Sequence, residues 1–336
     1  MIYFDRRWDG DTGIGRFSRE VSSRLSGFRD LPLTGNPASP FDVLRLTWFM
    51  ILNPRALVFS PGYSAPLFGL NRFFFTVHDL NHIDTPGNSG FFKRLYYKLV
   101  LKRACRGAGR IFTVSDFSKK RIVDWAGISS SRVVCTGNGV SDIFSSSAKN
   151  DVDRDSLRGF LFSVGNRKLH KNEVASVKAL AAAKGLAGVR LVFTGEPSRE
   201  LLAEAMALGI DDRVQFLGAL TEEQLCGLYQ GALALIFPSL YEGFGLPAIE
   251  AMAIGCPVIA SATTALGEVV GDAALVVDPT DNAQITRAIE QLAGDVGLRQ
   301  ALHAKGIERA ATFSWSRVAA AVGRELPGLI TSERLQ

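Results

Sequence analysis

The chain has 336 residues, of which 47% are hydrophobic and 21% are charged, a composition that excludes a disordered or fibrous protein. At about 150 residues per domain, this length predicts two domains that each bury a core. Residues 1–150 hold 21 Lys/Arg and 11 Asp/Glu, a net charge of +10, whereas the rest of the chain holds 17 and 22, a net charge of −5. A positive charge confined to one half disfavours nucleic acid as a partner.

Short apolar runs alternate with helix-length segments along the whole chain. The runs predict buried strands at residues 2–4, 56–59, 73–77, 110–114, 133–136, 160–164, 190–194, 214–217, 234–237, 257–260 and 274–277. Helical patterns lie at residues 17–25, 90–104, 172–183, 198–207, 222–230 and 282–293. Continuous apolar strands separated by helices are typical of parallel sheets covered on both faces. We therefore predict an α/β fold with two doubly wound, Rossmann-like domains.

A polar segment at residues 145–158 separates the two strand–helix series and is the predicted linker. With this linker, we predict an N-terminal domain at residues 1–150 and a C-terminal domain at 151–312, followed by a helical segment at 313–336. Ligands of such sheets bind beyond the carboxyl ends of the strands, so we expect the chemistry in a cleft between two facing domains.

The cysteines and the apolar stretches indicate the compartment. Four cysteines occur, and none forms a C-x-x-C pair, which disfavours a zinc site and a disulfide framework; they are Cys105, Cys135, Cys226 and Cys256. The start of the chain lacks a signal-peptide pattern. The apolar stretch at 44–61 is interrupted and too short to cross a bilayer. The expectation is a soluble, reduced, cytoplasmic protein.

Two glycines and a histidine follow predicted strands in the first half. Gly13 and Gly15 lie after the first strand and open a helix, where they allow close approach of the backbone to a ligand. His78 and Asp79 lie at the end of the strand at 73–77. A single histidine at a strand end is more often structural, so from the residues alone both interpretations remain open.

The segment 91–110 carries seven cations and no acid, with aromatic side chains interleaved. Such a segment suits an anionic membrane surface. The alternative is that its apolar stripe packs on the sheet and its charges are simply solvated.

The loop after the strand at 160–164 concentrates positive charge in Arg167, Lys168 and Lys171. Cations at the end of a strand would neutralise a departing diphosphate. The alternative is that they are exposed loop charges.

The stretch 239–257 is the most informative part of the chain. A strand leads into a loop with Gly243 and Gly245, and a helix then opens at Pro247. Free amides at the start of that helix suit phosphates, and the carboxylates of Glu242 and Glu250 suit sugar and ribose hydroxyls. The alternative is that the glycines only make a turn and that Glu250 is a solvated helix residue.

This stretch resembles the E-x7-E signature of the GT4 retaining glycosyltransferases, which have the GT-B fold. Glu242 and Glu250 match its two glutamates, and the likeness covers nearly the whole chain, most clearly at residues 160–280. The resemblance implies that Glu242 holds hydroxyls of the donor sugar and that Glu250 holds the nucleotide ribose. It further implies that the diphosphate meets the amides of Gly243, Phe244, Gly245 and Leu246.

The same resemblance assigns roles outside this stretch. Lys171 and its neighbour Asn172 match a family step that binds donor phosphates, with Arg167 or Lys168 as a second cation. In the first domain, Gly13 and Gly15 resemble the glycine loop of the donor cleft, and His78 resembles the residue under the anomeric carbon. Asp79 orients His78 or meets the acceptor, and Ser115 also fits a family position at a strand end. The last helix is expected to cross back onto the N-terminal domain.

We therefore predict a retaining, metal-independent glycosyltransferase that moves a hexose from a nucleotide sugar, its co-substrate, without a cofactor. The pattern of the first half resembles bacterial mannosyltransferases of polysaccharide assembly, which favours GDP-mannose as donor and a lipid-linked glycan of lipopolysaccharide or O-antigen as acceptor. A UDP- or dTDP-sugar donor, a GT-B epimerase or phosphorylase, and a non-catalytic sugar-binding protein remain alternatives. The expected location is the cytoplasmic face of the inner membrane, with peripheral attachment through 91–110.

Overall fold

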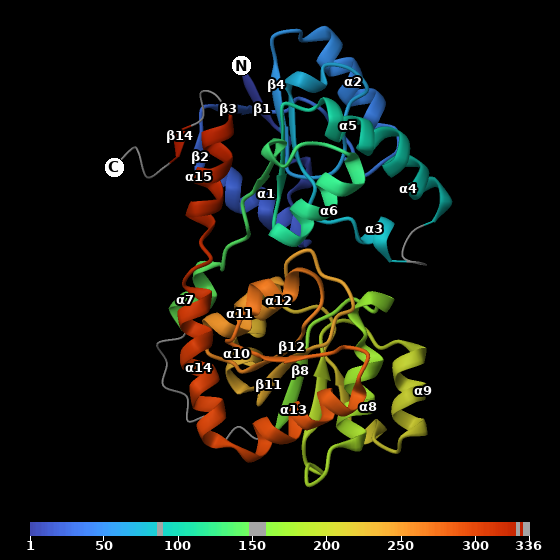
Figure 1. The fold of residues 1–336 in the computed structure, drawn as a ribbon, viewed down its shortest axis with the longest axis vertical. Helices are drawn as coiled ribbons and strands as arrows, with labels where there is room; N and C mark the ends of the chain where they lie inside the picture. The colour runs from blue at the N-terminus through green and yellow to red at the C-terminus, as the bar shows by residue number, and fades with distance from the viewer. Residues whose placement is uncertain (86–89, 148–158, 327–329, 332–336) are drawn as a thin grey trace. The chain divides into compact units, whose positions relative to one another are not determined.

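The computed structural model describes residues 1–85, 90–147, 159–326 and 330–331, and it divides into two compact units (Figure 1). The first unit is Met1–Gly139 together with Ser314–Gln336, and the second is Val140–Phe313. Of the predicted linker, residues 148–158 lie outside the described residues. Its first three residues end helix α7 (Asp142–Ser147), which packs on helices of the second unit with the Phe144 and Tyr229 rings 6.1 Å apart. The division therefore falls before α7, because that helix buries an aromatic side chain in the second unit.

The first unit is built on a six-stranded parallel sheet with the strand order β3-β1-β4-β5-β6-β7. Its strands are β1 (Ile2–Phe4), β3 (Phe28–Asp30), β4 (Leu57–Ser60), β5 (Phe73–Thr76), β6 (Arg110–Thr113) and β7 (Val133–Cys135). A short antiparallel pair joins β2 (Leu25–Ser26) to β14 (Ile330–Thr331). The helices are α1 (Gly13–Ser23), α2 (Asp42–Leu52), α3 (Asn81–Asp84), α4 (Phe91–Tyr96), α5 (Lys102–Gly107), α6 (Asp116–Ala126) and α15 (Trp315–Glu325).

Helix α2 occupies part of the stretch that the sequence identified only as apolar and interrupted. Six of its residues are buried, of which Leu46, Phe49 and Met50 belong to the core, and the helix ends at Leu52. Further along the chain, the predicted helix at 90–104 is instead α4, a π-helical turn at Tyr97–Leu101 and α5 in succession. Among the described helices, none combines the length and the apolar character that a membrane span requires.

The second unit also has a six-stranded parallel sheet, with the strand order β10-β9-β8-β11-β12-β13. Its strands are β8 (Phe160–Ser163), β9 (Arg190–Phe193), β10 (Val214–Phe216), β11 (Ala234–Phe237), β12 (Val258–Ser261) and β13 (Leu275–Val277). Its helices, besides α7, are α8 (Glu173–Ala182), α9 (Arg199–Ala207), α10 (Glu222–Gly231), α11 (Leu246–Ala253), α12 (Thr264–Val270), α13 (Asn282–Gly294) and α14 (Val296–Ala310). The strand order reverses between β8 and β11, so a crevice is expected at their carboxyl ends.

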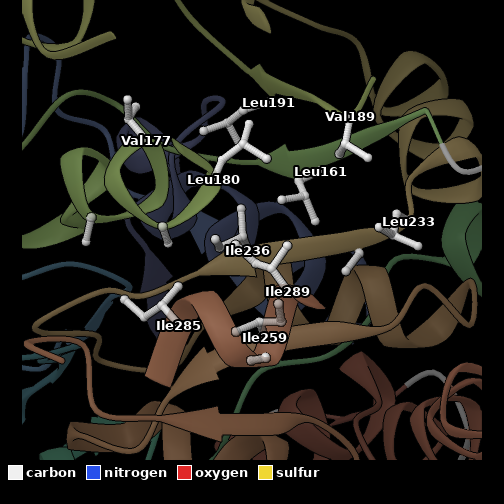
Figure 2. Packing of buried hydrophobic residues seen from close by; sticks show 14 of the residues in the cluster. Leu161, Val177, Leu180, Val189, Leu191, Leu233, Ile236, Ile259, Ile285 and Ile289 are labelled. Atoms are coloured by element: carbon white, nitrogen blue, oxygen red, sulfur yellow. The ribbon is translucent and has the colours of Figure 1, made fainter. Parts of the chain in front are cut away.

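The core of the second unit explains why these strands are apolar throughout. Figure 2 shows Leu161, Ile236 and Ile259, which come from three strands of the sheet, in one cluster with Leu180 of α8 and Ile289 of α13. All five side chains have no exposed surface. A strand that lies inside a sheet covered by helices needs apolar residues at successive positions, which makes its run continuous rather than alternating.

A buried ion network connects the first strand of the chain to α2. The Arg7 guanidinium lies 2.7 Å from Asp5 and 2.6 Å from Asp42, and both carboxylates are fully buried. Burial raises the pKa of Asp42, although the hydrogen bond from Arg7 acts in the opposite direction. Asp42 is the first residue of α2, so Arg7 holds the start of this helix against the loop that follows β1.

Substituting Arg7→Met is expected to lower the free energy of unfolding by about 3–5 kcal/mol, because it leaves two buried carboxylates without their cation. Arg6→Met is the matched control, since Arg6 is half exposed and its ion pair with Asp9 is on the surface. The control is expected to change the free energy by less than about 1 kcal/mol. Urea denaturation of the three proteins measures both values, and equal stabilities would show that Arg7 does not hold the network.

Candidate functional site

Lys171 and Glu242 meet at the point where the strand order of the second sheet reverses. Lys171 lies in the loop after β8, and Glu242 lies in the loop after β11. The Lys171 Nζ atom is 2.7 Å from the Glu242 carboxylate, and the two side chains are only 15% and 12% exposed. The same ammonium group lies 5.1 Å from the centre of the Phe237 ring. This pair therefore provides a cation and a hydroxyl acceptor side by side at the expected crevice.

The glycine loop after Glu242 is held by local sterics. Gly245 has a φ of 113°, and a Cβ atom there would lie 2.6 Å from the Leu266 side chain. Helix α11 begins at the next residue, with Pro247 in its first turn. Phe244 is buried against Phe313, with ring centres 5.5 Å apart. Residues 243–246 therefore form a rigid turn into a helix start, which is the geometry that binds phosphates through backbone amides.

Glu250 lies within α11 and is only 4% exposed. The Tyr229 hydroxyl, which comes from α10, donates to its carboxylate at 3.2 Å. The interpretation of Glu250 as a solvated helix residue is therefore wrong, because the helix turns this side chain inward.

Backbone strain gathers at the same edge of the sheet. Within the described ranges, the residues other than glycine with positive φ are Arg167 (62°), Asn172 (54°) and Thr264 (60°). All three follow strands of the second sheet, and such strain is commonly maintained at functional sites.

Two of these strained residues hold the loops together. Asn172 donates to the carbonyls of Pro238, at 3.1 Å, and Pro279, at 2.7 Å, and so joins the loops after β11 and β13. The Thr264 hydroxyl accepts a hydrogen bond from the Glu242 amide at 3.0 Å. Thr264 was missed from the sequence, because an ordinary threonine carries no signal that its backbone is left-handed.

Arg167 is engaged by groups of the protein itself. Its guanidinium pairs with Glu173, donates to the carbonyl oxygens of Thr194 and Glu196, and lies 5.1 and 5.2 Å from the rings of Phe193 and Phe216. Its side chain is 16% exposed, so it is not a freely solvated loop charge.

The carboxylate that Arg167 neutralises is itself buried. Burial raises the pKa of Glu173, and the nearby Arg167 counteracts this shift. Lys168, by contrast, is exposed. Of the three predicted loop cations, Lys171 is the one that the structure brings to Glu242.

Gly13 and Gly15 of the first unit differ in burial and in the role that each glycine has. Gly15 is buried, and a Cβ atom there would lie 2.3 Å from the carbonyl oxygen of Gly10. Its amide donates to the Thr12 hydroxyl at 3.1 Å, which caps α1. Gly13 is exposed as the first residue of that helix. Gly15 is thus required for packing, while Gly13 leaves the helix start open.

His78 lies after β5 in a well-defined orientation. Its Nε2–H donates to the carbonyl of Pro61 at 2.8 Å, and the Phe17 ring meets it edge-on with ring centres 5.1 Å apart. Burial lowers the pKa of His78, against the opposing effects of Pro61 and Asp79, so the neutral imidazole is favoured.

Asp79 and Ser115 both accept backbone hydrogen bonds. The Asp79 carboxylate accepts from the Asn81 amide at 2.9 Å, and the Ser115 hydroxyl accepts from the Ser118 amide at 3.0 Å and so caps α6. Among the described residues, no three His, Cys, Asp or Glu side chains gather as metal ligands.

Comparison with known proteins identifies the family. Residues 146–309 match the family described as Glycosyl transferases group 1. The chain is 31% identical over 353 residues to O-antigen chain mannosyltransferase B of Escherichia coli, and the match covers 90% of this chain and 93% of that protein.

Two solved structures support the fold. One is WaaG, a glycosyltransferase involved in lipopolysaccharide biosynthesis, with a TM-score of 0.77 and 18% identity over 98% of this chain and 100% of that one. The other is Anabaena HepE in complex with UDP and glucose, with a TM-score of 0.74 and 17% identity over 96% and 98% of the two chains. At these identities the likeness establishes the fold alone. The chain belongs to the group 1 glycosyltransferases and has the GT-B fold.

Proposed function

We propose that this chain transfers mannose, with retention of configuration, from a nucleotide sugar to a glycan acceptor in O-antigen or related polysaccharide assembly. The observation that carries the proposal is the Lys171–Glu242 pair at the carboxyl ends of β8 and β11, in a chain of this family. The name of the Escherichia coli relative, an O-antigen chain mannosyltransferase that is similar along 90% of this chain, supports the sugar and the pathway.

Different residues of the second unit would bind different parts of the donor. Lys171 would face the diphosphate, and the amides of residues 243–246 would hold its oxygens at the start of α11. Glu242 would accept hydrogen bonds from hydroxyls of the donor sugar, and Glu250 would accept from the ribose. In the protein without donor, Lys171 and Glu242 neutralise each other across 2.7 Å, so donor binding would exchange this contact for contacts to phosphate and sugar.

Transfer would then proceed on one face of the sugar. The bond between the anomeric carbon and the diphosphate oxygen breaks, and the acceptor hydroxyl oxygen forms the new bond from the same side. The proton of that hydroxyl passes to the departing phosphate oxygen, and Lys171 stabilises the negative charge that develops there. Arg167, whose guanidinium is engaged by Glu173, would support the loop that carries Lys171.

In the first unit, His78 and the start of α1 at Gly13 would meet the reacting sugar. His78 would do so as a neutral imidazole, because burial lowers its pKa and Pro61 accepts its Nε2 proton. Asp79 and Ser115 would contribute to the acceptor side. No metal is required by this scheme, since cations and amides oppose the diphosphate.

GDP-mannose is the proposed donor, and a UDP-sugar is the alternative. The mannosyltransferase name of the Escherichia coli relative supports the former, and the UDP bound in HepE, a protein similar in fold, supports the latter.

The acceptor is proposed to be a lipid-linked glycan at the cytoplasmic face of the inner membrane. The segment 91–110, with seven cations and no acid, would attach the chain peripherally to anionic lipid. Arg94 and Lys98 are both exposed in this segment.

Glu242→Ala and Glu242→Gln are each expected to reduce kcat/KM for transfer at least about 100-fold, because both remove the anionic acceptor for donor hydroxyls. Glu223→Ala is the matched control, since Glu223 is exposed on α10 and is expected to leave activity unchanged. Steady-state kinetics measure the effect, with urea denaturation to confirm that the fold is retained. Full activity in a folded Glu242 variant would overturn the site.

A donor panel tests the sugar and nucleotide. GDP-mannose is expected to give the highest kcat/KM in comparison with GDP-glucose, UDP-glucose and a dTDP-sugar. Proton NMR of the product is expected to show the same anomeric configuration as the donor. Turnover with a UDP-sugar but not with GDP-mannose would show that the proposed donor is wrong. A product of inverted anomeric configuration would exclude the retaining mechanism.

Vesicle co-sedimentation tests the basic segment. Binding to vesicles with anionic lipid is expected to exceed binding to neutral vesicles and to weaken with salt. The double variant Arg94→Glu/Lys98→Glu is expected to lose more than about tenfold in affinity. The control Lys184→Glu/Arg199→Glu makes the same charge change at exposed sites of the second unit. Equal binding by the two double variants, or equal binding to neutral and anionic vesicles at all salt concentrations, would refute the attachment.

A further inference from the structure

Helix α2 presents an apolar face that no described part of the protein covers. The large side chains on this face lie one helical turn apart, and we call them the α2 stripe: Phe41, which is 69% exposed, Leu44 at 60%, Trp48 at 63%, Ile51 at 50% and Leu52 at 60%. The opposite face contributes Leu46, Phe49 and Met50 to the core. A continuous stripe of this size, with an aromatic at its centre, marks an interaction surface rather than scattered apolar residues.

The α2 stripe is physically joined to the basic segment 91–110. The Thr47 hydroxyl of α2 accepts a hydrogen bond from the Leu67 amide at 2.8 Å. Phe68, the next residue, is 58% exposed, and the Arg103 guanidinium lies 5.9 Å from the centre of its ring. Arg103 belongs to α5 and also donates to the Leu67 carbonyl. Figure 1 shows α2, α5 and α4 along one side of the first unit.

The charges around the α2 stripe indicate which kind of partner covers it. Residues 43–78 contain three cations and no acid, and residues 90–115 contain seven cations and no acid. Arg45 and Arg55 lie on and just after α2, and both are exposed. A second copy of the chain would bring two such cationic surfaces together, and like charges across an interface oppose association. An anionic surface is complementary to them.

We propose that the α2 stripe inserts into the interfacial region of an anionic lipid membrane, while Arg45, Arg55 and Arg103 contact the headgroups. Helix α2 buries one apolar face in the core and exposes the other, and an exposed apolar helix face beside cations suits a membrane interface. At about 1.5 Å per residue, its 11 residues are far too short to cross a bilayer. The inference rests on the proposed attachment through 91–110 and adds a second element, the α2 stripe, whose own apolar contribution is insensitive to salt.

The test compares Leu44→Ser/Trp48→Ser with wild type in sedimentation with vesicles of neutral and anionic lipid. The double variant is expected to lose at least about tenfold in partitioning, both at low salt and at high salt, because apolar contacts are lost and no charge changes. Met206→Ser is the matched control, since Met206 is 63% exposed on α9 of the second unit and is expected to bind like wild type. Equal partitioning of the double variant and the control would overturn the proposal.

Fluorescence quenching gives a second readout that does not depend on affinity. Of the four tryptophans, Trp48 is exposed and Trp125 is half-buried, whereas Trp8 and Trp315 are buried. Vesicles that contain brominated acyl chains are expected to quench wild type, and Trp48→Phe is expected to bind with little change but lose most of the quenching. Unchanged quenching in Trp48→Phe would overturn insertion of α2.

Further outcomes separate this inference from the proposed function. Donor turnover with a water-soluble acceptor is expected to be the same in Leu44→Ser/Trp48→Ser and wild type, so failure of mannose transfer would count against the proposed function alone. Loss of the salt-sensitive binding in Arg94→Glu/Lys98→Glu tests the basic segment separately.

A wild-type dimer in sedimentation velocity that becomes monomeric in the α2 variant, with unchanged vesicle binding, would assign the stripe to a second copy and overturn its insertion. Binding of an acidic protein that is lost in the α2 variant, with no vesicle binding by wild type, would overturn it equally.

Discussion

The ion pair between Lys171 and Glu242 is the interaction on which the second unit's site depends. Both side chains are largely withdrawn from water, and a pair of this kind recovers little more in mutual attraction than it loses in desolvation. Its position is therefore better explained by function than by stability. The loops that carry the two residues are held by Asn172, which bonds to Pro238 and Pro279, and by Thr264, which bonds to the Glu242 amide. The positive φ angles of Asn172 and Thr264 thus occur in the loops that bring the two opposite charges to one sheet edge.

The parallel sheet makes this convergence possible. Strands β8 and β11 are neighbours in the sheet although they begin at Phe160 and Ala234, 74 positions apart in the chain. Because the two strands are parallel, their carboxyl ends lie at the same edge. A loop that leaves each strand can therefore present a side chain to a common ligand. Arg167 illustrates the support that such a loop requires, because its guanidinium is enclosed by two aromatic rings, a carboxylate and two carbonyl oxygens.

In the first unit, a buried ion network fixes the position of a helix. Arg7 is held by Asp5 and Asp42, and Asp42 begins α2. This contact fixes the start of the helix, and the core fixes its inner face. The outer face remains apolar and exposed, which would be an aggregation hazard for a protein with no partner for it. The proposed function and the proposed membrane contact of α2 are thus consistent with one architecture.

The sequence by itself determined the fold class and most of the strands, because buried parallel strands require continuous apolar runs; the run at 234–237, for example, matches β11. It also identified Glu242, since a glutamate, two glycines and a proline in this order leave a recognisable pattern. It did not reveal α2, whose stretch is apolar on both faces and has no helical period. Only the tertiary structure decided that Lys171, rather than Arg167, meets Glu242, that Glu250 turns toward Tyr229, and that Thr264 holds the Glu242 amide. These contacts join residues far apart in the chain, and local sequence carries no information on which partners the folded sheet brings together.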